Sequence, residues 1–456
     1  MTYIAAQLAD YIANSSFDNL PPEVIHRVKL CIRDSIGCSL AGSTTNVGKI
    51  LIETIEDLSG NNPSTIMGSG SKTSPPYAAF VNGNMADICE LNDAYGATII
   101  EPAIAVGELV KATGKELINA CCLGYEVSGR IGTAVRPTLS PRVIAHGSGG
   151  HQTFGAATAA SKLLALNKEM AANAFGIAGT NAPLPCNMKT IEGELGNSST
   201  VKNNFGMASL VGVLSAMLAK KGFTGPPDVF EGDTGFWKMY GSDRCDFGKI
   251  TEDLGKKYIV MDMGFKFYSA CAATFGALDA VESIMQKHKI VAEDLEKIVV
   301  KASSSVARMP WINTEPPKTM YEGEFDIPYT VALKIMGLAG TPGPGWYTED
   351  KLKSPQIYQI IRKVKLEPDV ECDRLRTLGI GLTKVEITTK GNRYTERVEI
   401  KGLDPRRHTF SDQELEDKFK YLAGLAISKE KVERLAQLLE GLENLESIDE
   451  LAKLLY

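Results

Sequence analysis

The stretch TFGAATAASKLLAL, Thr153–Leu166, is built almost entirely from small and apolar residues and predicts a helix. Gly206–Lys220 has the same composition. Side chains this small let neighbouring backbones approach closely, so the two segments predict a tightly packed helical core. Most of the first half of the chain continues this pattern. A helix start is expected at Leu20-Pro-Pro-Glu23, where proline comes early and an acid lies in the first turn.

The pattern changes near Lys266, where strand signals begin. Two runs rich in β-branched residues are joined by Gly391-Asn392-Arg393, which is typical of a hairpin. The elements expected in this region are a helix at Ala277–His288, a strand at Glu296–Ala302, a helix at Ser354–Val364, and the two hairpin strands at Lys384–Lys390 and Tyr394–Ile400.

After Pro405 the chain returns to helix, from Asp412 onward. A helical segment that follows an α+β insert indicates that the C-terminus rejoins the first domain. We therefore expect a fold that is mainly α with a smaller α+β lid. Residues 1–266 and 403–456 would form the helical domain, and residues 267–402 the lid domain.

The composition of the chain excludes several classes of function. The net charge is −6 over 456 residues, which argues against nucleic acid as a partner. No stretch approaches the length of a membrane span, and no signal peptide is recognisable. The nine cysteines are irregularly spaced, as expected of reduced thiols in a cytoplasmic protein. C-x-x-C, H-E-x-x-H and G-x-G-x-x-G are absent from the sequence, so we expect no zinc, no iron–sulfur cluster and no nucleotide cofactor.

A glycine-rich turn at Ala145–Gly155, AHGSGGHQTFG, precedes the first of the small-residue helices. Free N–H groups at a helix start can bind an anion, and Gly149 and Gly150 would let it approach. His146 and His151 flank the turn, and histidine is well suited to proton transfer near neutral pH. The alternative is an ordinary capped turn.

Asp87, Glu90 and Asp93 recur at three-residue spacing, with Asn92 beside them. On a helix these acids would share one face and repel one another. A solvent-exposed face is therefore the default interpretation, although the apolar residues around them weaken it.

Lys266 lies between aromatic residues in Phe265-Lys-Phe-Tyr268, and Lys202 comes just before a helix. A lysine in apolar surroundings has a lowered pKa and can act as a base, or it can bind a substrate carboxylate. The alternative is a surface lysine whose stem alone is buried.

Several short motifs, in this order along nearly the whole chain, resemble those of the MmgE/PrpD family, whose members include 2-methylcitrate dehydratase, cis-aconitate decarboxylase and iminodisuccinate epimerase. Each is weak alone, and their collinear order carries the resemblance. They are Asp34–Gly42 (D-x-x-G-C-x-x-A-G), Ala78–Gly83 (A-A-F-x-N-G), His146 with Phe154-Gly155, Gly222–Pro227 (G-F-T-G-P), Lys266–Cys271 (K-x-Y-x-x-C), Phe325–Tyr329 (F-x-x-P-Y) and Lys418-Phe419.

The resemblance implies a homodimer, a helical domain built from both chain ends, a lid that closes over the active site, and no metal or organic cofactor. It places the catalytic residues at Asp93, His146, Lys266 and Tyr321. The residues expected to bind the substrate are Asn92, Glu101, Gly149, Gly150, His151, Lys202 and Tyr268.

The sequence departs from the family pattern at several histidines. The family's A-H-x-x-D-x-D-D reads Ala86-Asp-Ile-Cys-Glu-Leu-Asn-Asp93, its H-P reads Glu101-Pro102, and an L-H reads Asn203-Asn204. Carboxylates and amides thus replace imidazoles. Such a pocket is expected to take a less anionic substrate than a tricarboxylate, or one carrying an amine.

The expected activity is that of a metal-free lyase, a dehydratase or decarboxylase, which abstracts a proton next to a carboxylate of a small carboxylic acid. Lys266 or His146 would be the base, Asp93 would orient or protonate the substrate, and Lys202 would hold its carboxylate. One alternative is an epimerase of an amino- or imino-dicarboxylate. Another is an inactive family member that serves as a binding dimer.

Overall fold

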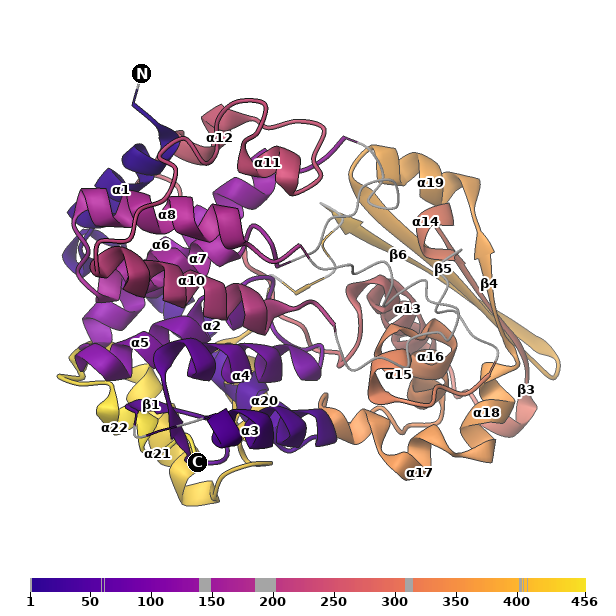
Figure 1. The fold of residues 1–456 in the computed structure, drawn as a ribbon. Coiled ribbons are helices and arrows are strands. Elements are labelled where there is room, and N and C mark those ends of the chain that lie inside the picture. The colour runs from indigo at the N-terminus through magenta and orange to yellow at the C-terminus, as the bar shows by residue number, and fades with distance from the viewer. Residues whose placement is uncertain are drawn as a thin grey trace.

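The computed structural model describes residues 2–58, 60, 62–138, 149–184, 202–307, 315–401, 404, 406, 407 and 409–456. A large helical body and a smaller α+β part lie side by side (Figure 1). The prediction of a mainly helical fold with an α+β region is confirmed. Among the described helices, none is long and apolar enough to cross a membrane. Every described cysteine is a free thiol.

Small residues at helix contacts hold the helical body together. A Cβ on Gly212 of α10 would lie 2.4 Å from the Cβ of Ala156 of α7, so the two helices meet where neither has a bulky side chain. The long helices of this body are α1 (Ile4–Asn14), α2 (Pro22–Ser43), α3 (Asn46–Leu58), α4 (Pro75–Ile88), α5 (Ile100–Val110), α6 (Gly114–Ala134), α7 (Thr153–Leu163), α8 (Lys168–Asn181) and α10 (Phe205–Lys220). Shorter elements are β1 (Ser64–Thr65), β2 (Lys72–Thr73), α11 (Phe236–Met239) and α12 (Phe247–Thr251).

The C-terminal helices α20 (Asp412–Ala423), α21 (Lys429–Glu440) and α22 (Asp449–Ala452) return to this body (Figure 1, yellow). A buried ion pair joins the two chain ends, with Lys418 Nζ of α20 2.6 Å from Asp34 Oδ1 of α2. Beside it, a Cβ on Gly37 would lie 3.2 Å from the ring of Phe419. The first and last of the family-like motifs thus contact each other, and the prediction that both ends share one helical body is confirmed.

The α+β part has its own hydrophobic core, formed by buried residues between Ala277 and Ile387. Its sheet has the strand order β4-β3-β5-β6, in which β3 pairs with β4 in parallel and with β5 antiparallel. The strands are β3 (Leu295–Ala302), β4 (Val364–Pro368), β5 (Ile380–Thr389) and β6 (Asn392–Lys401). The helices are α13 (Phe275–Lys287), α14 (Ser304–Ala307), α15 (Met320–Phe325), α16 (Ile327–Ile335), α17 (Glu349–Leu352), α18 (Pro355–Ile361) and α19 (Val370–Thr377).

Two boundaries in this part differ from the sequence-based expectation. The helix expected to continue to Val364 ends at Ile361, and Val364 begins a strand that was not expected. The expected hairpin loop is shorter, because Asn392 already pairs with Thr389 and Gly391 adopts φ 92° in the tight turn. In Figure 1 helices α13, α15 and α16 lie between the sheet and the helical body.

Candidate active site

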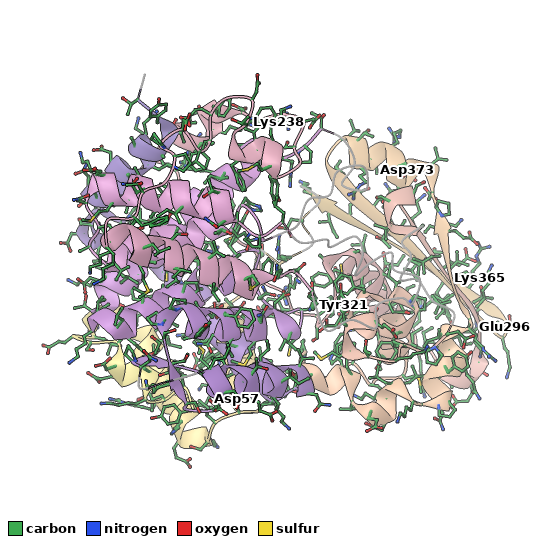
Figure 2. All side chains as sticks on the ribbon, viewed as in Figure 1. Asp57, Lys238, Glu296, Tyr321, Lys365 and Asp373 are labelled. Carbon is green, nitrogen blue, oxygen red and sulfur yellow. The ribbon has the colours of Figure 1, made fainter. Side chains whose placement is uncertain are left out.

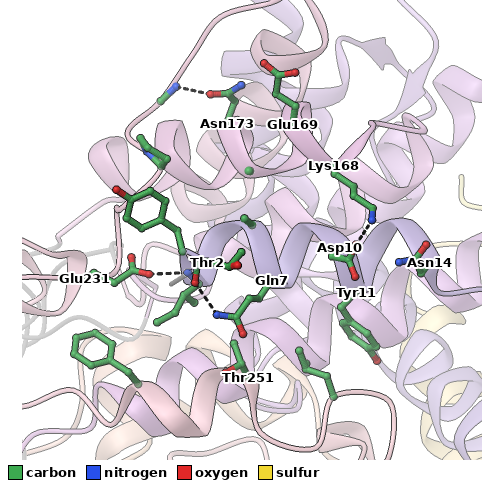
Figure 3. Close-up of a pocket in the computed structure, with 18 of the residues that line it drawn as sticks. Thr2, Gln7, Asp10, Tyr11, Asn14, Lys168, Glu169, Asn173, Glu231 and Thr251 are labelled. Atoms are coloured by element: carbon green, nitrogen blue, oxygen red, sulfur yellow. Dashed lines mark hydrogen bonds and ion pairs between the residues drawn. The ribbon is translucent and has the colours of Figure 1, made fainter.

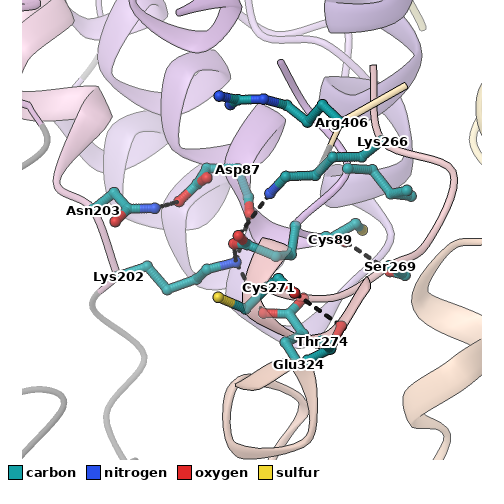
Figure 4. Close-up of polar contacts among 12 residues, drawn as sticks. Asp87, Cys89, Lys202, Asn203, Lys266, Ser269, Cys271, Thr274, Glu324 and Arg406 are labelled. Atoms are coloured by element: carbon teal, nitrogen blue, oxygen red, sulfur yellow. Dashed lines mark hydrogen bonds and ion pairs between the residues drawn. The ribbon is translucent and has the colours of Figure 1, made fainter. Parts of the chain in front are cut away.

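A cluster of buried charged side chains lies where the helical body meets the α+β part (Figure 4). Its members are Asp87 at the end of α4, Glu90 just after it, Lys202, Lys266, and Glu324 in α15. The expectation of an exposed acidic helix face is wrong. Helix α4 ends at Ile88, and Glu90 follows in a left-handed conformation with φ 51°. Asp87, Glu90 and Asp93 are 5%, 6% and 4% exposed.

Lys202 is surrounded by oxygen atoms. Its Nζ donates to the Asp87 carbonyl at 2.7 Å, to the Ile88 carbonyl at 3.3 Å and to Glu324 Oε2 at 2.9 Å, and it lies 2.8 Å from Glu90 Oε2. An ammonium has only three N–H donors, so these contacts use its whole capacity. Burial alone lowers the pKa of Lys202, but Glu324, Glu90 and Asp87 raise it well above its ordinary value. The expected lowering of a lysine pKa is wrong here, and Lys202 is a fixed cation.

Glu90 is the carboxylate that joins the two lysines. Its Oε1 accepts a hydrogen bond from Lys266 Nζ at 2.7 Å, and its Oε2 faces Lys202. Burial alone would raise the pKa of Glu90, but the two ammonium groups outweigh it and lower the pKa to about 2. Glu90 is therefore ionised. Among the described residues, Lys266 donates a hydrogen bond to Glu90 alone.

Glu324 and Asp87 are the less compensated acids of the cluster. Burial raises the pKa of Glu324 well above its ordinary value, although Lys202 opposes the shift. Its Oε1 is buried and has no hydrogen-bond partner among the described residues. Burial also raises the pKa of Asp87, whose Oδ2 accepts a hydrogen bond from Asn203 Nδ2 at 3.0 Å.

Tyr321 lies with this cluster, on the side of the α+β part that faces the helical body (Figure 2). Its ring centroid is 5.9 Å from Lys202 Nζ, and the residue is 8% exposed. Glu324 was not identified from sequence, although it directly precedes the F-x-x-P-Y motif that begins at Phe325. Its position beside that motif was the available signal.

Asp93 is held by the turn that follows it. Its Oδ1 accepts hydrogen bonds from the N–H groups of Tyr95 at 2.7 Å and Gly96 at 2.6 Å, and its Oδ2 accepts one from Tyr125 Oη at 2.6 Å. These contacts fix the turn into the 3₁₀ helix Gly96–Thr98. They give Asp93 a structural role, and its part in proton transfer stays a prediction.

The glycine turn lies beside the segment that carries Lys202. A Cβ on Gly149 would be 3.2 Å from the Asn203 carbonyl oxygen, and one on Gly150 would be 3.0 Å from the Tyr240 ring. His151 Nδ1 is 3.1 Å from Tyr240 Oη. The N–H groups of Gln152, Phe154 and Gly155 bind carbonyl oxygens within the turn, so they are not available to an anion. His146 lies outside the described residues.

Glu101, Asn92 and Tyr268 make no described contact with the charged cluster. Glu101 Oε1 accepts hydrogen bonds from Ser35 Oγ at 2.7 Å and Ser39 Oγ at 2.8 Å, and burial raises its pKa to about 8. Asn92 is buried. The Tyr268 hydroxyl lies within hydrogen-bond distance of Asp279 and Glu282 in the α+β part.

A wide surface groove of about 1680 Å³ lies elsewhere, along α1 and the start of α8 (Figure 3). No member of the charged cluster lines it. We base the site on the cluster, because its ionisable groups are buried and converge, whereas the Asp10–Lys168 ion pair of the groove is exposed to solvent. Within the described part of the chain, no group of His, Cys, Asp and Glu residues is arranged to hold a metal ion.

Comparison with known proteins places these features in a family. Residues 6–246 match the MmgE/PrpD N-terminal domain, and residues 268–444 match the MmgE/PrpD C-terminal domain. The chain is 25% identical to the cis-aconitate decarboxylase of Aspergillus terreus (strain NIH 2624 / FGSC A1156) over 465 residues, covering 96% of this chain and 92% of that protein. It is 26% identical to the cis-aconitate decarboxylase of Homo sapiens, covering 96% of this chain and 91% of that protein. The chain therefore belongs to the MmgE/PrpD family.

Proposed function

We propose that this chain is a lyase, most closely a carboxy-lyase, that acts on a small carboxylic acid at the carbon next to a carboxylate. The observation that carries the proposal is the buried ammonium of Lys266, 6% exposed, which the described residues engage with a single hydrogen bond. Its other N–H groups can hold a substrate carboxylate. The similarity to cis-aconitate decarboxylases supports the same class of reaction.

The chemistry needs a place for negative charge and a group that moves a proton. In a decarboxylation the C–C bond to one carboxylate breaks, carbon dioxide leaves, and its electron pair stays on the adjacent carbon as an enolate-like anion. A cation in a water-poor site stabilises this charge far more than it would in water. Lys266 supplies that cation, and Lys266 or His146 transfers the proton at carbon.

The proposal is tested by mass spectrometry of a panel of unsaturated, hydroxy and amino acids incubated with the purified protein in D₂O. A carboxy-lyase should release carbon dioxide and place deuterium on the carbon that carried it. A hydro-lyase should release water, and deuterium can then appear only in substrate recovered from partial reaction. An epimerase would give a product that differs from the substrate only in the configuration of the α-carbon and that carries deuterium there. No turnover and no exchange with any acid would favour the inactive binding dimer.

We also propose that two copies of the chain pack together through the outer face of α10. Met207 and Leu214 are 38% and 41% exposed and lie two helical turns apart. Leu210 and Val211, between them, are half-buried, so an apolar stripe faces outward from the helical body. The homodimer implied by the family resemblance gives this stripe an occupant, a second copy.

Leu214→Asp should therefore shift the protein from dimer to monomer, because a carboxylate would be buried in an apolar contact. Sedimentation velocity across a concentration series measures the change. Val370→Asp is the matched control, since Val370 is 86% exposed on α19, in the α+β part. An unchanged dimer in Leu214→Asp would show that α10 is not the interface.

A further inference from the structure

The charged cluster holds more carboxyl groups than ammonium groups. Asp87, Glu90 and Glu324 face the two cations Lys202 and Lys266, and all five side chains are buried or nearly so (Figure 4). Arg406, also drawn in Figure 4, is bonded to Asp404 at 2.8 Å and brings no uncompensated positive charge. Within the described part of the site, one acid therefore lacks a cation of its own.

Among the described residues of the cluster, Glu324 is the acid with a buried oxygen that neither a hydrogen bond nor an ion pair reaches. Glu90 is bound by both lysines, and the Asp87 carboxylate, which contacts neither lysine, accepts a hydrogen bond from Asn203. Glu324 shares Lys202 with Glu90, and its Oε1 is enclosed without a hydrogen-bond partner among the described residues. Lys202 has no N–H left to give it. A buried oxygen without a hydrogen-bond partner destabilises the folded protein, and a ligand that supplies a hydrogen-bond donor removes this cost.

We infer that the substrate carries an amino group whose ammonium binds Glu324, while its carboxylate binds Lys266. The inference rests on the proposed function, because it names the substrate class of that same site. An ammonium supplies both the missing positive charge and the missing hydrogen-bond donor. A hydroxyl would supply only the donor.

The protonation of Glu324 fits this assignment. Burial raises the pKa of Glu324 well above its ordinary value, although Lys202 opposes the shift, so the unliganded carboxyl binds a proton more readily than an exposed glutamate does. Binding of an ammonium favours the ionised form. The carboxyl proton then leaves to solvent, and its electron pair stays on the oxygen that meets the ammonium.

A tricarboxylate is a poor match to this cluster. Cis-aconitate carries three carboxylates, and the described cluster has no excess of cations to meet them. Lys202 is already saturated and Lys266 can serve one carboxylate, whereas Glu324 and Asp87 would repel the others if ionised. The relatives' substrate is therefore not the expected one.

The test compares acids that differ only by an amino group, such as succinate with aspartate, glutarate with glutamate, and propionate with alanine. Calorimetric titration near neutral pH, in two buffers of different ionisation enthalpy, gives both affinity and proton release. For at least one pair the amino acid should bind about tenfold more tightly or better, with a release of protons that the acid without the amino group does not show. Cis-aconitate should bind more weakly than that amino acid.

Glu324→Gln should abolish both the proton release and the preference for the amino member, while the acid without the amino group binds as before. Glu322→Gln is the matched control on the same helix α15, because its contacts are the Lys318 and Thr319 turn rather than the cluster. A merely structural role for Glu324 would weaken both members of a pair equally, and that result overturns the inference.

The inference is also overturned if, in the natural protein, no amino acid binds more tightly than the acid that lacks only its amino group. The same holds if no amino acid of the panel binds. Its failure is separable from failure of the proposed function. A protein that binds an amino acid with proton release, but releases neither carbon dioxide nor water and incorporates no deuterium in D₂O, keeps the substrate class and loses the lyase chemistry.

Discussion

Replacing Lys266 with alanine should lower kcat by about 10²–10⁴-fold, the usual contribution of a positioned proton-transfer group. That range corresponds to about 3–5 kcal/mol in the activation free energy. Lys266 is buried and bonded to Glu90 at 2.7 Å, so the alanine variant removes the only described ammonium of the cluster that has N–H groups left for a substrate. The measurement is steady-state turnover of the substrate that the acid panel identifies, with thermal unfolding recorded in parallel.

Lys266→Arg separates two roles of this lysine. Arginine keeps the positive charge but does not deprotonate in proteins, so it cannot serve as a base. Partial recovery of kcat in Lys266→Arg would indicate that charge stabilisation dominates. Equal loss in the arginine and alanine variants would favour proton transfer by the lysine itself.

Lys72→Ala is the matched control for these variants. Lys72 also pairs with a buried glutamate, Glu108, at 2.7 Å, but at the small β1–β2 hairpin and away from the charged cluster. It should leave kcat near the natural value. If Lys266→Ala also keeps the natural rate, the site assignment is wrong. His146→Ala, made in the same series, then tests the other candidate base.

The sequence predicted the architecture because the relevant signals are local. Residues adjacent in the sequence were enough to predict the small-residue helices, the hairpin turn and the strand at Leu295–Ala302. Each lies within a few residues of its predicted position. The joining of the two chain ends followed from the order of the elements, because helix returns after the α+β insert, and the Asp34–Lys418 ion pair is one of the contacts that hold the ends together.

The site was harder to predict because its contacts are long-range. Lys202 and Glu324 are 122 positions apart, and nothing near either residue indicates the other. Apolar neighbours in sequence predicted a lowered lysine pKa, but for Lys202 carboxylates from other segments decide the direction. The prediction of an exposed acidic helix face was wrong for a local reason. It assumed a continuous helix, but Glu90 adopts a left-handed conformation that ends the helical periodicity.

Asp93 and Glu90 show how this changes the interpretation of a motif. The resemblance identified Asp93 as the catalytic acid, but three hydrogen bonds tie it to its own turn and to Tyr125. Glu90, three residues earlier, is the carboxylate that contacts both lysines. A motif thus locates the site, while only the fold determines which of its acids faces the cluster.

Lys418→Met should destabilise the folded protein by about 3–5 kcal/mol, because it leaves the buried carboxylate of Asp34 without a counterion. Lys418 also donates to the Leu91 carbonyl at 2.9 Å, so a second buried group loses its partner. Chemical denaturation measures the change in unfolding free energy. Lys420→Met is the matched control two residues along α20. Its partners are at the surface, so its loss should cost at most about 1 kcal/mol.

The double variant Asp34→Asn with Lys418→Met should recover part of this loss, since no unpaired charge then remains in the core.

The pH dependence of the stability of Lys418→Met supplies a second check. Burial raises the pKa of Asp34 to about 6 even with Lys418 present, and removing the lysine raises it further. In the variant the folded state can hold a neutral Asp34 at acid pH, whereas the unfolded chain ionises above about pH 4. The stability difference between natural protein and variant should therefore grow as pH rises above 6. A difference that stays flat or shrinks there would show that Asp34 is not the group left unpaired.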